Sequence, residues 1–133
     1  MNRLRQTVSS YPFSLAVIII IWVLCLIPIP ETPLNQISLI DKWTHFVMYG
    51  GLCTVVWAEY TLRHPQPSKR NRFLWTFVMP WAMGGLVELA QAYCTGGRRS
   101  GDIVDFIADG IGVVIGQLTG MLAARALSSW RKD

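Results

Sequence analysis

The 133-residue sequence contains little charge, because only 15% of its residues are Asp, Glu, Lys or Arg, whereas about a quarter are charged in ordinary soluble domains. Hydrophobic residues make up 52% of the chain. This composition excludes a disordered tail, a coiled coil and a collagen, and it indicates a membrane protein. Spans of about 20 residues each would use up nearly the whole chain, so no separate soluble domain is expected.

The sequence also lacks the short motifs of the common soluble chemistries. It contains no CxxC, HExxH, P-loop or GxSxG motif. Its cysteines are an odd number of three, and two of them, Cys25 and Cys53, lie in apolar runs, so no disulfide framework is expected. We therefore expect no cofactor and no bound metal. The net charge of +4 is explained below by topology and gives no reason to expect nucleic-acid binding.

Four apolar runs predict four transmembrane helices, at residues 13–29, 42–62, 73–93 and 102–127. The first run follows a basic start and resembles a signal peptide, but small residues at a cleavage site are missing, so we expect an uncleaved anchor. Pro80 predicts a kink in the third run, which membrane helices tolerate because neighbouring helices satisfy the freed carbonyl. The predicted fold class is an all-α integral membrane protein, a single four-helix bundle.

Basic residues are distributed unevenly among the predicted connections. Nine of the twelve Lys and Arg residues lie in the N-terminus, the second connection and the C-terminus. Because cytoplasmic loops retain Lys and Arg, both termini are predicted to be cytoplasmic, and segments 31–41 and 94–101 are predicted to lie outside. Six of the eight acidic residues fall in the outer half. The outer end of the bundle is therefore predicted to be acidic and the inner end basic.

Ionisable residues from three helices fall at one depth, just below the predicted outer surface. His45, Glu88 and Asp109 each lie about 6 to 10 Å inside the outer ends of their helices. An unpaired charge facing lipid costs several kcal/mol, so these side chains are expected to point inward and meet. Glu88 needs a cationic partner or a proton, and His45 or Arg99 are natural partners. We expect a polar pocket that opens outward, with the first helix packed outside it.

The fourth helix combines an acidic mouth with a seam of small residues. Asp102, Asp105 and Asp109 recur every three or four residues, so they share one helix face. Glycines continue this helix at a spacing of four, which lets another helix approach closely. The glycines of the seam are Gly112, Gly116 and Gly120. We expect the seam to pack within the molecule rather than to form a dimer.

Side chains at the outer ends of the helices, together with the loop before the fourth helix, make up the predicted pocket. Its basic groups would hold anionic parts of a ligand, because Arg binds phosphate with two parallel hydrogen bonds. Its acids and its Gln side chain would meet hydroxyls or amides. The candidate ligand-binding residues are Asp41, Lys42, His45, Tyr49, Glu88, Gln91, Arg98, Arg99, Asp102, Asp105 and Asp109.

Structural roles compete with binding for several polar residues. Asp102 is also a good N-cap for the fourth helix. Lys42 can extend its ammonium group to the membrane interface. At the inner end, Glu59 and Arg63 are four residues apart and are predicted to form an exposed helix pair.

Three blocks of the sequence resemble a known family. DKWTHFVMYG looks like D-K-x-x-H-F-x-x-Y, GGLVELAQ looks like G-x-x-x-E-x-x-Q, and RRSGDIVDFIADGIGVVIG looks like a third block with an Arg six residues before an Asp and two later glycines. Together they are similar to the VanZ-like family of bacterial membrane proteins, over residues 13–120. Asp109 departs from the family pattern, which has Asn there. The matching positions are Asp41, Lys42, His45, Tyr49, Glu88, Gln91, Arg99, Asp105, Gly112 and Gly116.

The resemblance implies a small multi-pass protein of the bacterial cytoplasmic (inner) membrane, whose namesake gives low-level resistance to teicoplanin, a lipid-tailed glycopeptide antibiotic. Two function classes fit. We favour a binding protein whose pocket holds an envelope lipid headgroup, such as that of a lipid-linked cell-envelope precursor, or that modulates lipoglycopeptide susceptibility. The alternative is a membrane-embedded hydrolase or transferase acting on a lipid-linked phosphate or acyl group. In it His45 or Glu88 would be general base or acid, and Asp105 with Asp109 would orient it or bind a divalent ion. The ligand and the oligomeric state stay open.

Overall fold

The computed structural model describes residues 2–27, 38–97 and 101–132, and these residues form only helices and short connections. The predicted all-α class is confirmed. The helices are α1 (Arg3–Ser10), α2 (Pro12–Leu26), α3 (Ser38–Arg63), α4 (Lys69–Phe73), the π-helical turn η2 (Leu74–Val78), α5 (Met79–Cys94) and α6 (Ile103–Trp130).

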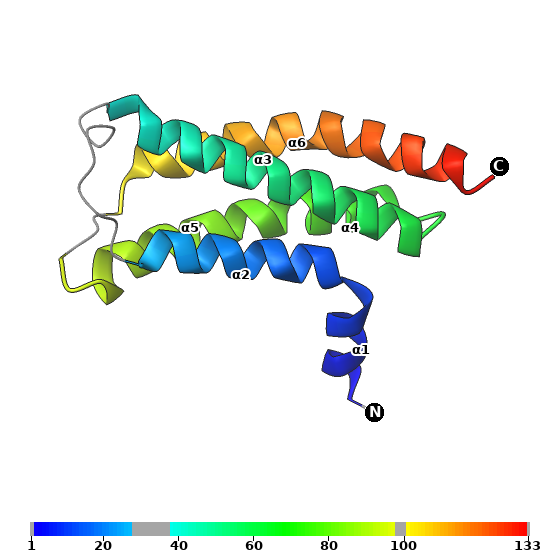
Figure 1. Cartoon of the computed structure of the whole chain (residues 1–133), viewed down its shortest axis with the longest axis horizontal. Helices are drawn as coiled ribbons and strands as arrows, with labels where there is room; N and C mark the ends of the chain where they lie inside the picture. The colour runs from blue at the N-terminus through cyan, green and yellow to red at the C-terminus, as the bar shows by residue number, and fades with distance from the viewer. Residues whose placement is uncertain (1, 28–37, 98–100, 133) are drawn as a thin grey trace.

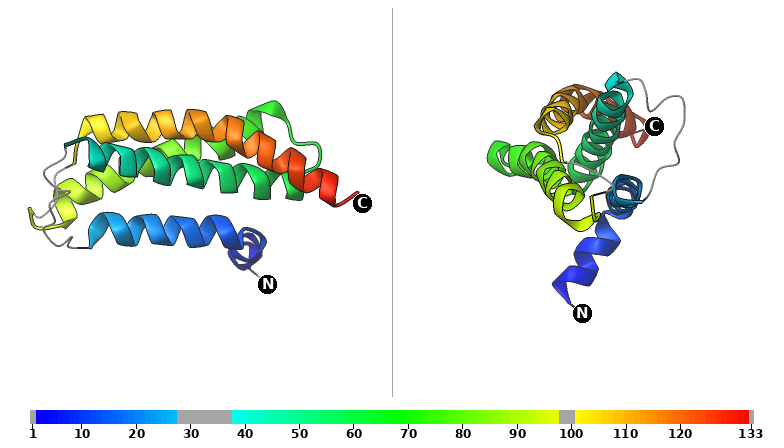
Figure 2. Two further views of the ribbon diagram at one scale, coloured as in Figure 1. Left: turned by 45° about the horizontal axis from the view of Figure 1, so that its top comes forward. Right: turned by 90° about the vertical axis from the view of Figure 1, so that its left-hand side faces the viewer.

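The longer helices α2, α3, α5 and α6 run side by side as one bundle, and both chain ends lie toward the same end of it (Figure 1). α3 packs along α6, and α2 packs against α3 and α5. Figure 2 shows the bundle end-on, with α2 on its outside next to the end of α5. This arrangement brings the C-terminal end of α5 and the N-terminal ends of α3 and α6 to one end, which carries the candidate site.

The described residues contain two helical stretches that are long and apolar enough to cross a bilayer, Lys69–Cys94 and Ile103–Trp130. The pair α1 and α2 would make a third only if its 88° bend lies within one span. α3 has 26 residues but is not among these stretches, and it includes Asp41, Lys42 and Glu59. The helices are thus compatible with a membrane protein of two or three spans by length and composition, and the fourth span stays a prediction.

A π-helical turn, η2, lies directly before the helix α5 that contains Pro80, the residue at which the sequence predicts a kink. Proline has no N–H group, so the carbonyl of Thr76, four residues earlier, lacks its usual helical donor. The side-chain amide of Gln117 on α6 donates to this carbonyl at 2.8 Å, and the Cys53 thiol on α3 donates to it at 3.1 Å. The neighbouring helices therefore satisfy the freed carbonyl, as the position of Pro80 predicts.

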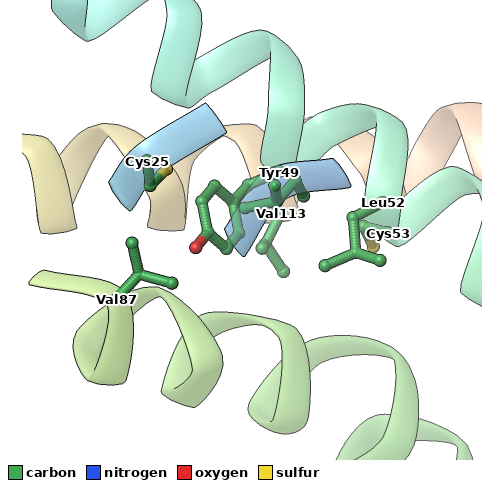
Figure 3. Packing of buried hydrophobic residues seen from close by; sticks show 7 residues of the cluster. Cys25, Tyr49, Leu52, Cys53, Val87 and Val113 are labelled. Carbon is green, nitrogen blue, oxygen red and sulfur yellow. The ribbon is translucent and has the colours of Figure 1, made fainter. Parts of the chain in front are cut away.

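The apolar core joins the four long helices (Figure 3). Its buried members come from α2, α3, α5 and α6, and they are Ile21, Cys25, Tyr49, Leu52, Cys53, Val87 and Val113. The three glycines of the seam on α6 face α3. A Cβ atom at Gly116 would lie 2.5 Å from Cys53 Cβ and 2.9 Å from the Gly50 carbonyl oxygen. Only a residue without a side chain lets the two helix backbones come this close.

The helix α2 corresponds to the predicted run 13–29, but it ends at Leu26 and has only 15 residues. At its N-terminal side the chain bends by 88° into α1. The Glu59 carboxylate on α3 accepts hydrogen bonds from the backbone N–H groups of Phe13 and Ser14 at 3.1 and 2.8 Å, and from the Ser14 hydroxyl at 2.6 Å. The first N–H groups of a helix have no partner inside the helix, and Glu59 supplies one.

The predicted pairing of Glu59 with Arg63 is therefore wrong. Among the ion pairs of the described residues, none joins these two side chains. The physical reason is that both oxygens of the Glu59 carboxylate accept donors at the start of α2. Arg63 remains exposed at the end of α3.

Candidate functional site

A buried group of ionisable side chains lies at the end of the bundle where α3 and α6 begin and α5 ends. It consists of His45 on α3, Glu88 on α5, and Asp105 and Asp109 on α6, and we call it the polar cluster. Each of these residues is at most 7% exposed. Three separate helices therefore bring ionisable groups to one place, as predicted from the equal depth of His45, Glu88 and Asp109 in their helices.

The imidazole of His45 is at the centre of the polar cluster. Its Nδ1 atom lies 2.9 Å from Asp109 Oδ1 and 3.5 Å from Glu88 Oε1. Its Nε2 atom lies 3.9 Å from Asp105 Oδ2 on the other side of the ring. An imidazole can donate from both nitrogens only when it carries two protons, and it is then a cation. One ring therefore faces three carboxylates, with Asp109 and Glu88 beside Nδ1 and Asp105 beside Nε2.

Lys42 and Asp102 form the rim above the polar cluster. The Lys42 ammonium lies 3.3 Å from Asp102 Oδ2 and 3.2 Å from Asp105 Oδ1. Asp102 is the N-cap of α6, since its Oδ1 accepts the N–H of Val104 at 2.8 Å. This N–H and the Lys42 ammonium lower the pKa of the Asp102 carboxyl below its ordinary value of 3.8. Asp102 therefore caps α6, which is the structural role that the sequence offered as an alternative to ligand binding.

The start of α6 is also held against α5. The backbone N–H of Asp102 donates to Glu88 Oε2 at 2.8 Å. Gly101, the residue before it, passes so close to α5 that an added Cβ would lie 2.5 Å from the Glu88 carbonyl oxygen. Glu88 thus connects the two helices through one oxygen and turns the other toward His45.

Two oxygens of the polar cluster, Glu88 Oε1 and Asp109 Oδ2, are buried without a hydrogen-bond partner. The hydroxyl of Tyr49, four residues after His45 on α3, is a third such atom. The cluster places three carboxylates around one imidazole, and the Lys42 ammonium is shared between Asp105 and Asp102, so negative charge exceeds positive charge unless protons or a further cation are added. Burial of an uncompensated charge is strongly unfavourable. A proton, a cation or a donor group of a ligand would satisfy these oxygens.

The ligand atoms of the cluster are close enough to hold a metal ion. One atom each from His45, Glu88 and Asp109 lie within 4.8 Å of one another, and so do atoms from Asp41, His45 and Asp105. Imidazole nitrogen with carboxylate oxygens is a ligand set typical of zinc in catalytic sites. The sequence analysis expected no metal because the spacing along the chain has no metal motif, and only its enzyme alternative had Asp105 and Asp109 bind a divalent ion. The ligands found here come from three helices.

Other candidate residues have different surroundings. The Gln91 amide donates to the Cys25 carbonyl at 3.0 Å, so it connects α5 to the end of α2. The Tyr49 ring is stacked parallel to the His45 ring at a centroid distance of 6.4 Å. Asp41 is exposed at the start of α3. Arg98 and Arg99, which were expected to hold anionic groups, lie outside the described residues.

Gly84 begins the GGLVELAQ block, and it was expected on the same helix face as Glu88 and Gln91 but was not among the candidate ligand-binding residues. It lies on α5 opposite Asp109, and an added Cβ would be 2.7 Å from Asp109 Oδ2. A side chain here would displace the carboxylate from its place beside His45. The signal available in the sequence is the spacing of four between Gly84 and Glu88, which puts both on one face of the helix.

An open groove of about 560 Å³ borders the polar cluster between α5 and α6. Most of its lining is apolar, and Glu88 and Asp102 are its two acidic residues. The lining residues are Ala82, Gly85, Leu86, Glu88, Leu89, Ala92, Tyr93, Gly101, Asp102, Ile103 and Phe106. A hydrocarbon chain fits the apolar wall, while a polar group at its end would reach the carboxylates.

The arrangement offers hydrogen-bond acceptors at the cluster, one ammonium group at the rim and an apolar wall beside them. It also offers a histidine paired with a carboxylate, which can accept and return a proton. These are the features of a site for an amphiphilic molecule. No family model, curated protein or solved structure matches this chain.

Proposed function

We propose that this chain is a VanZ-like protein of the bacterial cytoplasmic membrane whose polar cluster binds the headgroup of an envelope lipid at the outer leaflet. In this proposal the helices α2, α3, α5 and α6 are four spans and both termini are cytoplasmic. The observation that carries the proposal is the meeting of His45, Glu88, Asp105 and Asp109 beside an apolar groove. The burial of ionisable side chains from three helices beside an apolar groove supports the binding of an amphiphile.

The shape of the bundle and the distribution of charge support the orientation. Both chain ends and the connection between α3 and α4 lie at one end of the bundle (Figure 1). The chain segments at that end carry most of the Lys and Arg residues, whereas the polar cluster lies at the opposite end. With the basic end cytoplasmic, the acidic end would lie at the outer leaflet.

The charge of the cluster indicates which headgroups it would hold. Its carboxylates outnumber its cations, and they accept hydrogen bonds. A headgroup rich in hydroxyl, amide or ammonium donors complements them, as in a sugar-bearing or peptide-bearing lipid precursor. Lys42 at the rim would contact an anionic linkage of the same molecule. The same role for Arg98 and Arg99, which lie outside the described residues, stays a prediction from the sequence. A protein that holds such a lipid would change how a lipoglycopeptide of the teicoplanin type reaches its target.

The experiment is lipid mass spectrometry on the protein purified in mild detergent. Ala92→Trp places a large ring in the groove and changes no residue of the polar cluster, because Ala92 lines the groove and is exposed. Ala126→Trp places the same ring on an exposed position of α6 outside the groove. We expect a co-purified envelope lipid with the wild type and with Ala126→Trp, and its loss with Ala92→Trp and with Glu88→Gln. Retention of the lipid by a folded Ala92→Trp protein would reject the groove as the site.

Susceptibility to teicoplanin tests the physiological part of the proposal. Expression of the wild type in a deletion strain should raise the inhibitory concentration, and expression of Glu88→Gln should not. Equal membrane levels of both proteins, measured by immunoblotting, separate a lost function from a lost fold. An unchanged inhibitory concentration with wild-type protein present would remove lipoglycopeptide susceptibility from the proposal and leave lipid binding to the first experiment.

A second candidate, a lipid hydrolase, is favoured by the His45 and Asp109 pair at 2.9 Å together with the metal-compatible geometry. His45 would take a proton from water, the water oxygen would attack phosphorus or a carbonyl carbon, and the departing alcohol would receive the proton. Metal analysis after incubation with Zn²⁺ separates the candidates. A stoichiometric ion that is absent in His45→Ala, with cleavage of the bound lipid, would favour the enzyme. An intact lipid without an ion would favour the binding protein.

A further inference from the structure

A second cavity lies at the other end of the bundle, between the C-terminal halves of α3 and α6 and the short helix α4. Its volume is about 380 Å³. It is lined by Trp57, Thr61, Arg72, Met121, Ala124, Arg125, Ser128, Ser129 and Lys132. We call it the basic cavity, because its ionisable lining residues are two arginines and one lysine.

The basic cavity has no negative partner among the described residues. The ion pairs between described residues involve only Lys42 and His45 as cations, so Arg72, Arg125 and Lys132 form no ion pair with a described acidic side chain. Three positive charges around one cavity repel one another unless an anion lies between them. The cavity therefore favours a ligand of negative charge.

Buried polar atoms at the cavity also lack partners. Arg72 Nε and Thr61 Oγ1 are buried without a hydrogen bond in the described part of the chain. The Arg72 guanidinium lies over the Trp57 ring, 5.6 Å from its centroid, and this contact holds it in place. A buried donor without a partner costs free energy, so these two groups point to an acceptor that comes from outside the chain.

We propose that the basic cavity binds a phosphate group, either in the headgroup of an anionic membrane lipid or in a free phosphate compound. The guanidinium fork of Arg72 or Arg125 matches two phosphate oxygens, and the hydroxyls of Thr61 and Ser128 can donate to a third. Its volume is roughly ten times the ~30 Å³ that one water molecule occupies in the liquid, so a substituted phosphate fits. In the topology proposed above this end is cytoplasmic, and basic pockets between membrane helices at a cytoplasmic face are a recognised place for anionic headgroups.

This site is independent of the lipid site proposed for the polar cluster. It shares no residue with the cluster or its groove, and it lies at the opposite end of the bundle. It selects negative charge, whereas the cluster selects hydrogen-bond donors. One site can therefore fail its test without affecting the other.

The test measures thermal unfolding of the full chain in a neutral detergent with three probes. The probes are phosphatidylglycerol, phosphatidylcholine as the zwitterionic comparison, and inorganic phosphate against chloride at equal ionic strength. We expect phosphatidylglycerol or inorganic phosphate to raise the unfolding temperature in a saturable way and phosphatidylcholine to have no such effect. Stabilisation by the lipid alone identifies a headgroup, and stabilisation by inorganic phosphate identifies a free phosphate compound. Stabilisation by neither would overturn the proposal.

Matched variants locate the effect. Arg72→Gln and Arg125→Gln each remove a cation from the cavity, and we expect each to weaken the saturable binding by about tenfold. Arg70→Gln and Arg131→Gln remove exposed cations from neighbouring positions that do not line the cavity, and we expect no change. Equal weakening in all four variants would overturn the proposal, because it would indicate attraction to a basic surface.

A folding defect in one variant does not remove the test. Arg72 packs on Trp57, so Arg72→Gln can lower stability for that reason alone. Arg125 is exposed at its position on α6, and Arg125→Gln is expected to fold. Unchanged affinity in a folded Arg125→Gln protein would overturn the proposal. Ser128→Ala adds a mild variant whose effect should be smaller than that of either arginine.

Discussion

The Nδ1 atom of His45 lies 2.9 Å from Asp109 Oδ1, and neither residue is more than 1% exposed. Glu88 Oε1 approaches the same nitrogen at 3.5 Å. One ring N–H cannot form a full hydrogen bond with both oxygens, which explains why Glu88 Oε1 has no partner of its own. His45 is thus the group on which the charge balance of the polar cluster depends.

Removal of the imidazole should destabilise the protein strongly. His45→Phe keeps a ring of similar size but leaves the buried Asp109 and Glu88 carboxylates without the imidazole between them, for which we expect a loss of about 3–5 kcal/mol in the free energy of unfolding. Tyr49→Phe is the control, because the Tyr49 hydroxyl is buried and has no partner, so its removal should change stability little. Chemical unfolding in detergent, followed by circular dichroism, measures both variants.

A double variant tests whether buried charge causes the loss of stability in His45→Phe. Asp109→Asn removes one buried carboxylate and keeps an oxygen acceptor at the same place. If uncompensated charge causes the loss in His45→Phe, adding Asp109→Asn should restore part of the stability, and the double-mutant cycle should show coupling between the two positions. Additive losses would show that packing of the ring, rather than charge, is what His45 contributes.

The rim should make stability depend on pH in the acid range. The pKa of the Asp102 carboxyl is lowered from 3.8 by the Val104 N–H and by Lys42, so its contribution is present above the pKa of the unfolded chain and is lost as pH falls through the lower folded value. Asp102→Asn still caps α6 but cannot pair with Lys42. The wild type should therefore be more stable at neutral pH, and the difference should vanish below the folded pKa. A difference that persists unchanged at pH 2 would contradict this.

The sequence predicts the place of the polar cluster better than its internal bonds. Helical spacing and the cost of charge in lipid put His45, Glu88 and Asp109 at one depth and turned inward, and the structure brings them together there. Which carboxylate His45 bonds depends on how three helices are rotated about their axes. That rotation is set by packing such as the Gly84 contact with Asp109, and it cannot be read from spacing along one helix.

The ends of the helices show a different limit of sequence reasoning. Glu59 and Arg63 have the spacing of a helix pair, yet the Glu59 carboxylate accepts hydrogen bonds from the N–H groups at the start of α2. The 88° bend between α1 and α2 leaves those groups without a preceding helical turn. The basic cavity depends likewise on distant segments, since Arg72 and Arg125 belong to different helices. Local patterns do not contain such long-range pairs.

The glycine seam provides a test of the packing between α3 and α6. Gly116→Ala would place a Cβ 2.5 Å from Cys53 Cβ and 2.9 Å from the Gly50 carbonyl, which is backbone and cannot rotate away. We expect a loss of about 1–3 kcal/mol from this overpacking. Gly51→Ala is the matched control, because nothing lies within 4 Å of the added Cβ. Thermal unfolding of both proteins would contradict the packing account if Gly51→Ala were the more damaging change.

The start of α2 should loosen when Glu59 loses its charge. Glu59→Gln replaces one carboxylate oxygen with an amide nitrogen, which is a donor facing the donors of Phe13 and Ser14. The expected cost is about 1–3 kcal/mol, since one of these N–H groups is left without an acceptor. Hydrogen exchange of the segment 12–26 in micelles should become faster, while exchange of α6 should not change. Arg63→Gln is the control four residues along α3, and it should leave exchange of α2 at the wild-type rate. If Arg63→Gln accelerates α2 as much as Glu59→Gln does, the two side chains act as a pair after all, and the carboxylate is not the cap of α2.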